Sequence, residues 1–310
     1  MYMKPAITGS TLAPEGMHVL YADRNEEYKV SYVKDVPYCT RGDVTLTMQM
    51  LFPEMPAGMM PGAPFADDSL KMPCVVYVQG SAWMKQNCYM SLPNLVDLAR
   101  AGFVVASVEY RPSFDAPWPA FLQDVKAAIR YLKANCKKFG IDKERIGIWG
   151  DSSGGHTALM VGSTGWVKEF DDEICPEETS EVKAVCSFYG LSDISKINDG
   201  PRNPVFVNGP ADRIPENILF RGNCAETPEI TAPGNPINYI EEGRDYPPFL
   251  MFHGDEDGMV PFLQSVLMYE KLRDAGKNVE FYKVKGADHG TRMWTKEVLD
   301  IVVKFFKCYV

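Results

Sequence analysis

The chain has 310 residues, 45% of them hydrophobic and 24% charged, a composition typical of a globular protein with a large core. Its formal net charge is −9 and its Lys and Arg are not clustered, so binding to nucleic-acid phosphates is not expected. The sequence contains no run of about 18 apolar residues, so no transmembrane helix is expected. The first residues lack the apolar core of a secretory signal, and the eight cysteines form no C-x-x-C pair, which together favour a cytoplasmic protein with free thiols.

The first expected elements are two strands of alternating polarity at residues 28–36 and 44–52. Turn-forming residues at 40–43 separate them, so we expect an antiparallel pair. Residues 55–69 are rich in Pro, Gly and Met and are expected to form a loop.

The rest of the chain alternates between short apolar runs and helical patterns. The apolar runs, which are typical of strands, occur at residues 74–78, 103–108, 145–149, 184–189, 249–252 and 279–284. The helical patterns occur at residues 92–100, 119–139, 154–162, 261–275 and 293–308. Runs that are apolar on both faces suit parallel strands covered by helices on both sides. The pattern predicts one α/β domain over residues 1–310, with a mostly parallel sheet.

Two polar segments stand out from this alternation. The acidic run at 169–173 is expected to be a solvated loop rather than a metal site. Residues 191–248 contain many prolines and only one short helical stretch, at 216–220. A segment this long without a strand exceeds an ordinary connection. Its position favours a lid or pocket-forming insertion over the carboxyl ends of the strands, where open α/β sheets bind ligands.

Residues 150–154, Gly-Asp-Ser-Ser-Gly, carry the pattern G-x-S-x-G between a predicted strand and a helix start of small residues. In this context the pattern predicts a nucleophile elbow that exposes Ser152 on a sharp turn. A glycine-rich connection with a surface serine is the alternative. A serine nucleophile needs a base and oxyanion donors. The backbone N–H of Ser153, which directly follows the nucleophile, is expected to be one of those donors.

The chain has four histidines that are candidates for the base. His18 precedes the sheet and is expected on the surface. His156 lies one turn after Ser152 on the elbow helix, where a core or hydrogen-bonding role is expected. His253 ends a predicted strand, whereas His289 follows the last strand in a loop that can reach the elbow. His289 is therefore the expected base, with His253 as the alternative.

Residues 253–261 read His-Gly-Asp-Glu-Asp-Gly-Met-Val-Pro and resemble the H-G-x-x-D-x-x-V-P segment of the α/β hydrolases. The resemblance implies that Asp257, and not Asp255, is the catalytic acid. The chain order Ser, Asp, His is that of this superfamily. A trypsin-like enzyme also carries Gly-Asp-Ser-Gly, but its serine comes last, so that interpretation fails on order.

Residues 79–83, Gln-Gly-Ser-Ala-Trp, resemble the H-G-G-G-W loop of the hormone-sensitive-lipase-like esterases and the related bacterial feruloyl and acetylxylan esterases (BD-FAE). Residues 108–111 and 121–128 also resemble segments of that group, although Asp124 is expected to be structural. The resemblance implies an α/β-hydrolase fold and oxyanion donors from two loop residues. The expected donors are the backbone N–H groups of Gly80 and Ser81, with Ala82 as the alternative, and Trp83 is a candidate substrate contact.

These features predict a serine carboxylic-ester hydrolase that needs no metal or organic cofactor. The resemblance implies short-chain acyl or hydroxycinnamoyl esters as substrates, either small molecules or esters of sugars and plant polysaccharides. A peptidase or arylformamidase on the same fold, and a catalytically inactive binding protein, are the alternatives. No nucleic-acid or membrane partner is expected, and the sequence makes no prediction of oligomeric state.

Overall fold

The computed structural model describes residues 14–18, 29–53, 71–204 and 209–310, so the loop expected at 55–69 lies outside the described residues. In this part of the chain an eight-stranded sheet has the order β1-β2-β4-β3-β5-β6-β7-β8. The strands are β1 Val30–Arg41, β2 Val44–Pro53, β3 Met72–Val78, β4 Val104–Val108, β5 Ile141–Asp151, β6 Val185–Phe188, β7 Phe249–Gly254 and β8 Val279–Val284. β2 pairs antiparallel with β1 and β4, and all other neighbours are parallel, which confirms the predicted α/β-hydrolase architecture.

The first two strands form the predicted antiparallel pair, but β1 runs longer than the sequence pattern indicated. Thr40 pairs with Thr45 and Arg41 with Val44, so only two residues remain for the turn. Gly42 in that turn has φ 58°, a left-handed conformation that glycine adopts without steric cost.

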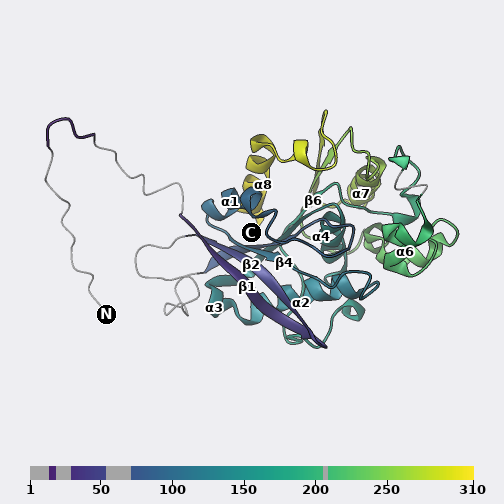
Figure 1. The fold of residues 1–310 in the computed structure, drawn as a ribbon, viewed down its shortest axis with the longest axis horizontal. Helices are drawn as coiled ribbons and strands as arrows, with labels where there is room; N and C mark the ends of the chain where they lie inside the picture. Colours follow the sequence, from purple (N-terminus) through teal and green to yellow (C-terminus); the bar gives the residue numbers. More distant parts are fainter. Residues whose placement is uncertain (1–13, 19–28, 54–70, 205–208) are drawn as a thin grey trace.

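Both faces of the central strands are buried, as their continuously apolar sequences predicted, whereas the edge strands β1 and β8 are partly exposed. Along β3, Cys74 and Val76 enter one core cluster while Val75 and Tyr77 enter the other. The first cluster lies under α2 Ala120–Ala134, α4 Ser153–Thr164 and α7 Leu263–Asp274. The second lies under α1 Leu92–Arg100 and α8 Lys296–Tyr309, which Figure 1 shows on the side of the sheet opposite α2.

The single long helix predicted at 119–139 is wrong in one respect, because it breaks at Asn135. α2 ends at Ala134, and a separate turn, α3 Cys136–Phe139, follows. The Asn135 side chain donates to the carbonyl of Tyr131 at 2.9 Å, and such local bonds compete with the helical ones. Gly140, with φ 63°, ends α3 in the left-handed conformation that glycine adopts at helix ends.

The segment 191–248 contains short helical turns and, in its described part, no strand. They are η2 Ile194–Lys196, η3 Ala211–Arg213, α6 Pro215–Phe220, η4 Pro228–Gly234 and η5 Pro236–Tyr239. The short helix predicted at 216–220 is confirmed as α6. η5 contacts both α4 and α7, so the segment packs on the domain that carries it. Two further turns, η1 Lys168–Phe170 and η6 Thr291–Met293, lie outside this segment.

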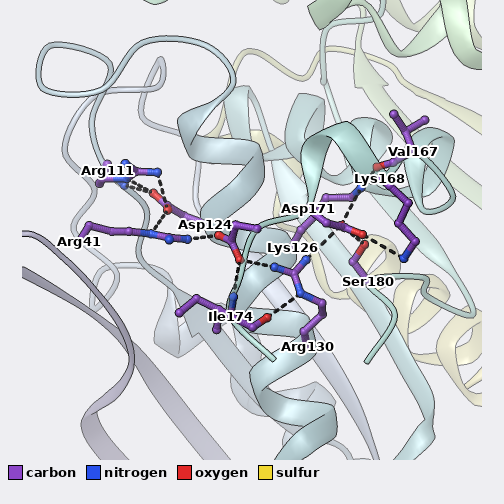
Figure 2. Close-up of polar contacts among 11 residues, drawn as sticks. Arg41, Arg111, Asp124, Lys126, Arg130, Val167, Lys168, Asp171, Ile174 and Ser180 are labelled. Carbon is purple, nitrogen blue, oxygen red and sulfur yellow. Dashed lines mark hydrogen bonds and ion pairs between the residues drawn. The ribbon is translucent and has the colours of Figure 1, made fainter. Parts of the chain in front are cut away.

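A network of charged side chains fixes α2 to its neighbours (Figure 2). Asp124 is fully buried and accepts hydrogen bonds from Arg111 Nε at 2.8 Å and from Arg41 Nε at 3.1 Å. Arg41 lies at the end of β1 and Arg111 follows β4, so one carboxylate ties three segments together. This geometry agrees with the structural role expected for Asp124.

The same network shows that the expectation for the acidic run at 169–173 is wrong for two of its residues. Asp171 lies 3.0 Å from Arg130 and 3.3 Å from Lys126, and Asp172 pairs with Arg130. Lys126 and Arg130 are buried, and burial lowers the pKa of Lys126 to about 8. The two carboxylates therefore serve as counter-ions of buried cations rather than as solvated charges.

Among the described residues, no helix is both long enough and apolar enough to cross a membrane.

Candidate active site

Ser152 lies on the turn between β5 and α4 and has φ 55° and ψ −124°. A non-glycine residue in this region is strained, and such strain persists where the surroundings fix it. The flanking glycines permit the turn, because a Cβ on Gly154 would lie 1.9 Å from the Val78 carbonyl oxygen. A Cβ on Gly150 would lie 2.1 Å from the carbonyl oxygen of Gly154. The backbone therefore has the sharp strand–turn–helix geometry that the motif predicted.

The structure brings Ser152, His289 and Asp257 together. His289 Nε2 lies 2.9 Å from Ser152 Oγ, and His289 Nδ1 lies 2.7 Å from Asp257 Oδ2. The three residues follow β5, β8 and β7, and the carboxyl ends of parallel strands meet at one edge of a sheet. The Asp257 carboxylate accepts a hydrogen bond from the protonated Nδ1 of His289. The unprotonated Nε2 is therefore left to accept a hydrogen bond from the Ser152 hydroxyl.

The Asp257 carboxylate is buried and accepts hydrogen bonds at both oxygens. Its Oδ1 accepts the backbone N–H groups of Met259 at 2.8 Å and Val260 at 2.9 Å. Burial opposes ionisation, but hydrogen bonds from His253 and His289 outweigh it and hold the pKa of Asp257 well below its usual range. Asp255, in contrast, is exposed and accepts the Gly286 N–H at 2.6 Å, as a turn residue does.

His253, the alternative base, is fully buried and both of its ring nitrogens are engaged. Its Nε2 lies 3.0 Å from the Val260 carbonyl oxygen and 3.2 Å from Asp257 Oδ2, while Nδ1 lies 2.8 Å from Ser265 Oγ. Because a carbonyl only accepts, Nε2 carries the proton. His253 therefore contacts the same Asp257 oxygen, Oδ2, as His289 does, and its own ring nitrogens are bonded away from Ser152.

In the oxyanion loop, residues 79–83, the available backbone N–H groups are not the ones expected from the sequence. The Gly80 N–H donates to Asp151 Oδ1 at 2.9 Å, and the Ser81 N–H donates to Ser153 Oγ at 2.9 Å. In the described part of the chain, no acceptor bonds the backbone N–H of Ala82 or of Ser153. The N–H groups of Gly80 and Ser81, the two expected loop donors, are thus already bonded, whereas that of Ala82, the alternative, is available together with that of Ser153.

Sequence reasoning missed two residues beside the site, Asp151 and Tyr189. Asp151 accepts the Tyr77 hydroxyl at 2.5 Å in addition to the Gly80 N–H, and burial raises the pKa of Asp151. The Tyr189 ring packs against the His289 ring with 4.5 Å between centroids. Position gave a signal for both, since Asp151 lies within the elbow motif and Tyr189 directly follows β6 at the same edge of the sheet.

Trp83 is corrected from a substrate contact to a buried residue. It is only 2% exposed, and its indole N–H donates to His156 Nδ1 at 3.1 Å. His156 is fully buried on α4, so the core and hydrogen-bonding role expected for it is confirmed. The lone indole donor and the close packing explain why Trp83 lies inside rather than in a pocket.

The segment 191–248 contacts the loop that carries Asp257. Arg202 Nε donates to the Met259 carbonyl at 3.0 Å, and the Asn203 N–H donates to the Gly258 carbonyl at 2.7 Å. This segment therefore borders the acid as well as the helix α4. Within the described ranges, no three His, Cys, Asp or Glu side chains gather in an arrangement that could hold a metal ion.

The sequence profile of the BD-FAE family matches residues 64–272. The chain is 30% identical over 220 residues to Esterase LipC of Mycobacterium tuberculosis, which covers 70% of this chain and 53% of LipC. A solved structure described as a truncated form of carbohydrate esterase from gut microbiota is 28% identical, with a TM-score of 0.76, and the match covers 91% of this chain and 97% of that one.

A second solved structure is the bifunctional GH43-CE protein of Bacteroides eggerthii, 30% identical with a TM-score of 0.76. The match covers 89% of this chain and 35% of that protein. The chain spans about half the length of the curated relatives it matches.

Proposed function

Because the chain belongs to the BD-FAE family of α/β-hydrolase esterases, we propose that it is a serine carboxylic-ester hydrolase. The observation that carries the proposal is the continuous hydrogen-bonded line from Ser152 Oγ through His289 to Asp257, with contacts of 2.9 and 2.7 Å, on a strained elbow. Nucleophile, base and orienting acid are the three groups that acyl transfer from an ester requires.

In the first half of the proposed reaction, Ser152 Oγ attacks the ester carbonyl carbon and its proton moves to His289 Nε2. Asp257 keeps its negative charge, fixes the His289 tautomer and stabilises the imidazolium that forms. Because its carboxylate is held by two backbone N–H groups, Asp257 needs no reorganisation during the step.

The negative charge that develops on the carbonyl oxygen is received by backbone N–H groups of Ala82 and Ser153. Both are free in the described structure, and Ser153 is the first residue of α4, where the helix dipole also favours negative charge. The Ser81 N–H directly precedes that of Ala82 in the chain and already donates to Ser153 Oγ, so it is a weaker candidate.

The tetrahedral intermediate collapses when His289 returns its proton to the alcohol oxygen, which leaves as the alcohol and leaves the acyl group on Ser152. Water then attacks the acyl-enzyme with His289 again as base, and the carboxylic acid is released. Every proton that moves in this cycle passes through His289 Nε2.

The proposed substrates are short-chain acyl or hydroxycinnamoyl esters of carbohydrates. The support is the likeness, at 28% and 30% identity, to proteins described as a carbohydrate esterase and as GH43-CE.

The test is to incubate the protein with a fluorophosphonate probe and to assay p-nitrophenyl acetate, acetylated xylan and methyl ferulate. We expect one labelled site at Ser152, located by peptide mass, and acid release from at least one carbohydrate or cinnamoyl ester. Hydrolysis of p-nitrophenyl acetate alone would contradict the substrate class but keep the esterase. No labelling and no hydrolysis would contradict both.

A further inference from the structure

The loop that carries the Ala82 N–H has an unusual backbone. Ala82 has φ 53° and Trp83 has φ 59°, so two consecutive residues with side chains occupy the left-handed region. Side chains make this region costly, and only tight surroundings maintain it. The N–H groups of such a loop keep their orientation only as long as the surrounding contacts maintain the strained backbone.

Bonds of Gly80 and Ser81 hold the loop before Ala82, and the contacts that hold it after Ala82 converge on Trp83. Its carbonyl oxygen accepts the Ser113 N–H at 2.8 Å and the Ser113 hydroxyl at 2.7 Å. Its indole N–H donates to His156 Nδ1 at 3.1 Å, and the two rings meet edge to face with 5.3 Å between centroids. Phe121 packs against both rings. Among the described residues, the Trp83–His156 bond is thus the polar contact that fixes the indole ring.

The chemistry of the partners fixes where the His156 proton lies. The indole N–H can only donate, so Nδ1 must accept. Nε2 lies 2.7 Å from the carbonyl oxygen of Gly234, which can only accept, so Nε2 carries the proton. Burial lowers the pKa of His156 to about 4, which keeps the ring neutral. Gly234 ends η4, within the segment 191–248.

We propose that His156 is a positioning residue for the oxyanion hole: it holds Trp83, and through it the Ala82 N–H, in the turn beside Ser152. Its tautomer is set by the Gly234 carbonyl, so the segment 191–248 contributes to the hole through the chain Gly234–His156–Trp83. The inference rests on the proposed ester hydrolysis, because an oxyanion hole has a role only in acyl transfer.

The test compares Trp83→Phe, His156→Gln and His156→Asn with the parent. Trp83→Phe keeps one aromatic ring and removes the indole N–H donor. The amide of Gln reaches the Nε2 position and that of Asn the Nδ1 position, so Gln keeps the Gly234 bond and Asn keeps an acceptor for Trp83. Phe121→Leu is the matched control, because it loosens the same packing and breaks no hydrogen bond.

With p-nitrophenyl acetate we expect kcat to fall about 10- to 100-fold in Trp83→Phe and His156→Gln with KM unchanged, since a misdirected donor weakens only the transition state. The Ki of a trifluoromethyl ketone, which forms an oxyanion on Ser152, is expected to rise by the same factor. His156→Asn is expected to keep more of kcat than His156→Gln, and Phe121→Leu to lower the melting temperature while kcat and Ki stay near the parent values.

Parent-like kcat and Ki in folded Trp83→Phe and His156→Gln would overturn the proposal. Losses in Phe121→Leu as large as theirs would also overturn it, because packing alone would then explain the effect. A Ser152→Ala variant assayed in parallel separates this result from the function itself. If Ser152→Ala is inactive while Trp83→Phe stays fully active, only the role of His156 fails.

Discussion

Two buried carboxylates of this protein, Asp257 and Asp124, differ in what their partners can do. Asp124 is fully buried against Arg111 and Arg41, which keep their charge at every working pH (Figure 2). Asp257 is also buried, but it bonds His289, whose side chain is 11% exposed and reaches Ser152. Burial and pairing alone therefore do not mark a catalytic carboxylate. In the proposed reaction, the partner of the carboxylate must also exchange a proton with a reacting group, as His289 does with Ser152.

The positions of the two carboxylates follow the same division. Asp124 lies within α2 and faces the end of β1, so it can only tie elements together. Asp257 follows β7 at the carboxyl edge of the sheet, where the segments that carry Ser152, after β5, and His289, after β8, also begin. The first carboxylate is expected to act on the free energy of unfolding and the second on the rate of the reaction.

Ser152→Ala has the largest expected effect. Removing the nucleophile is expected to lower kcat for p-nitrophenyl acetate by about 10³- to 10⁶-fold with the fold intact. Circular dichroism checks the fold, and Ser195→Ala, an exposed serine bonded to Asp193, is the matched control. Activity of Ser152→Ala near that of the control would mean that the elbow does not carry the chemistry.

Asp257→Asn is expected to lower kcat by about 10⁴-fold, because an amide at this position favours the wrong His289 tautomer. Asp255→Asn, two residues away and exposed, tests whether any charge in this loop suffices. We expect it to retain most of kcat. If Asp255→Asn proved the more damaging change, the acid would lie two residues earlier than the structure indicates.

Asp124→Ala is expected to cost about 3–5 kcal/mol of unfolding free energy, because it leaves the guanidinium groups of Arg41 and Arg111 without their shared carboxylate. Lys168→Ala, at the 70% exposed end of the same network, is expected to cost about 0–1 kcal/mol. Urea denaturation measures both. The distinction between the two carboxylates would fail if Asp124→Ala lost kcat while the protein was still folded, because its loss of stability would not explain that loss of rate.

The acid limb of the pH–rate profile is expected to have a slope of one. The pKa of Asp257 lies below its usual range in the folded protein, so its carboxylate stays ionised as the pH falls from neutrality to about 4. Asp257 then adds no protonation of its own to this limb, so a single protonation is left to limit the rate. The measurement is log(kcat/KM) against pH, on a protein shown to stay folded by circular dichroism. A slope of two would show that the acid titrates together with the base.

The smallest expected effect concerns the length of the acyl chain. In its described part, the segment 191–248 contains turns and the six-residue helix α6, and no long apolar helix to line a tunnel. Each buried CH₂ contributes about 0.8 kcal/mol only where such a tunnel exists. We expect kcat/KM for p-nitrophenyl esters to be highest from acetate to butyrate, below the micelle limit. A maximum at decanoate or longer would indicate a lipase-like pocket.

Much of the fold and the three side chains of the proposed triad could be predicted from the sequence because their signals are local. A strand followed by Gly-Asp-Ser-Ser-Gly and a helix specifies a turn by its own steric limits, and the structure has Ser152 at φ 55° there. The turn that follows β7 places Asp257 where its own Met259 and Val260 N–H groups bond it. The residues that decide such features lie within a few positions of one another.

The state of the oxyanion loop and of Trp83 was decided only by the tertiary structure. The Gly80 and Ser81 N–H groups are occupied by Asp151 and Ser153, which lie more than 70 positions along the chain. Trp83 is buried because His156, also from the elbow helix, accepts its indole proton. A hydrogen bond between distant segments depends on how the sheet and its helices pack, and no pattern of neighbouring residues records it.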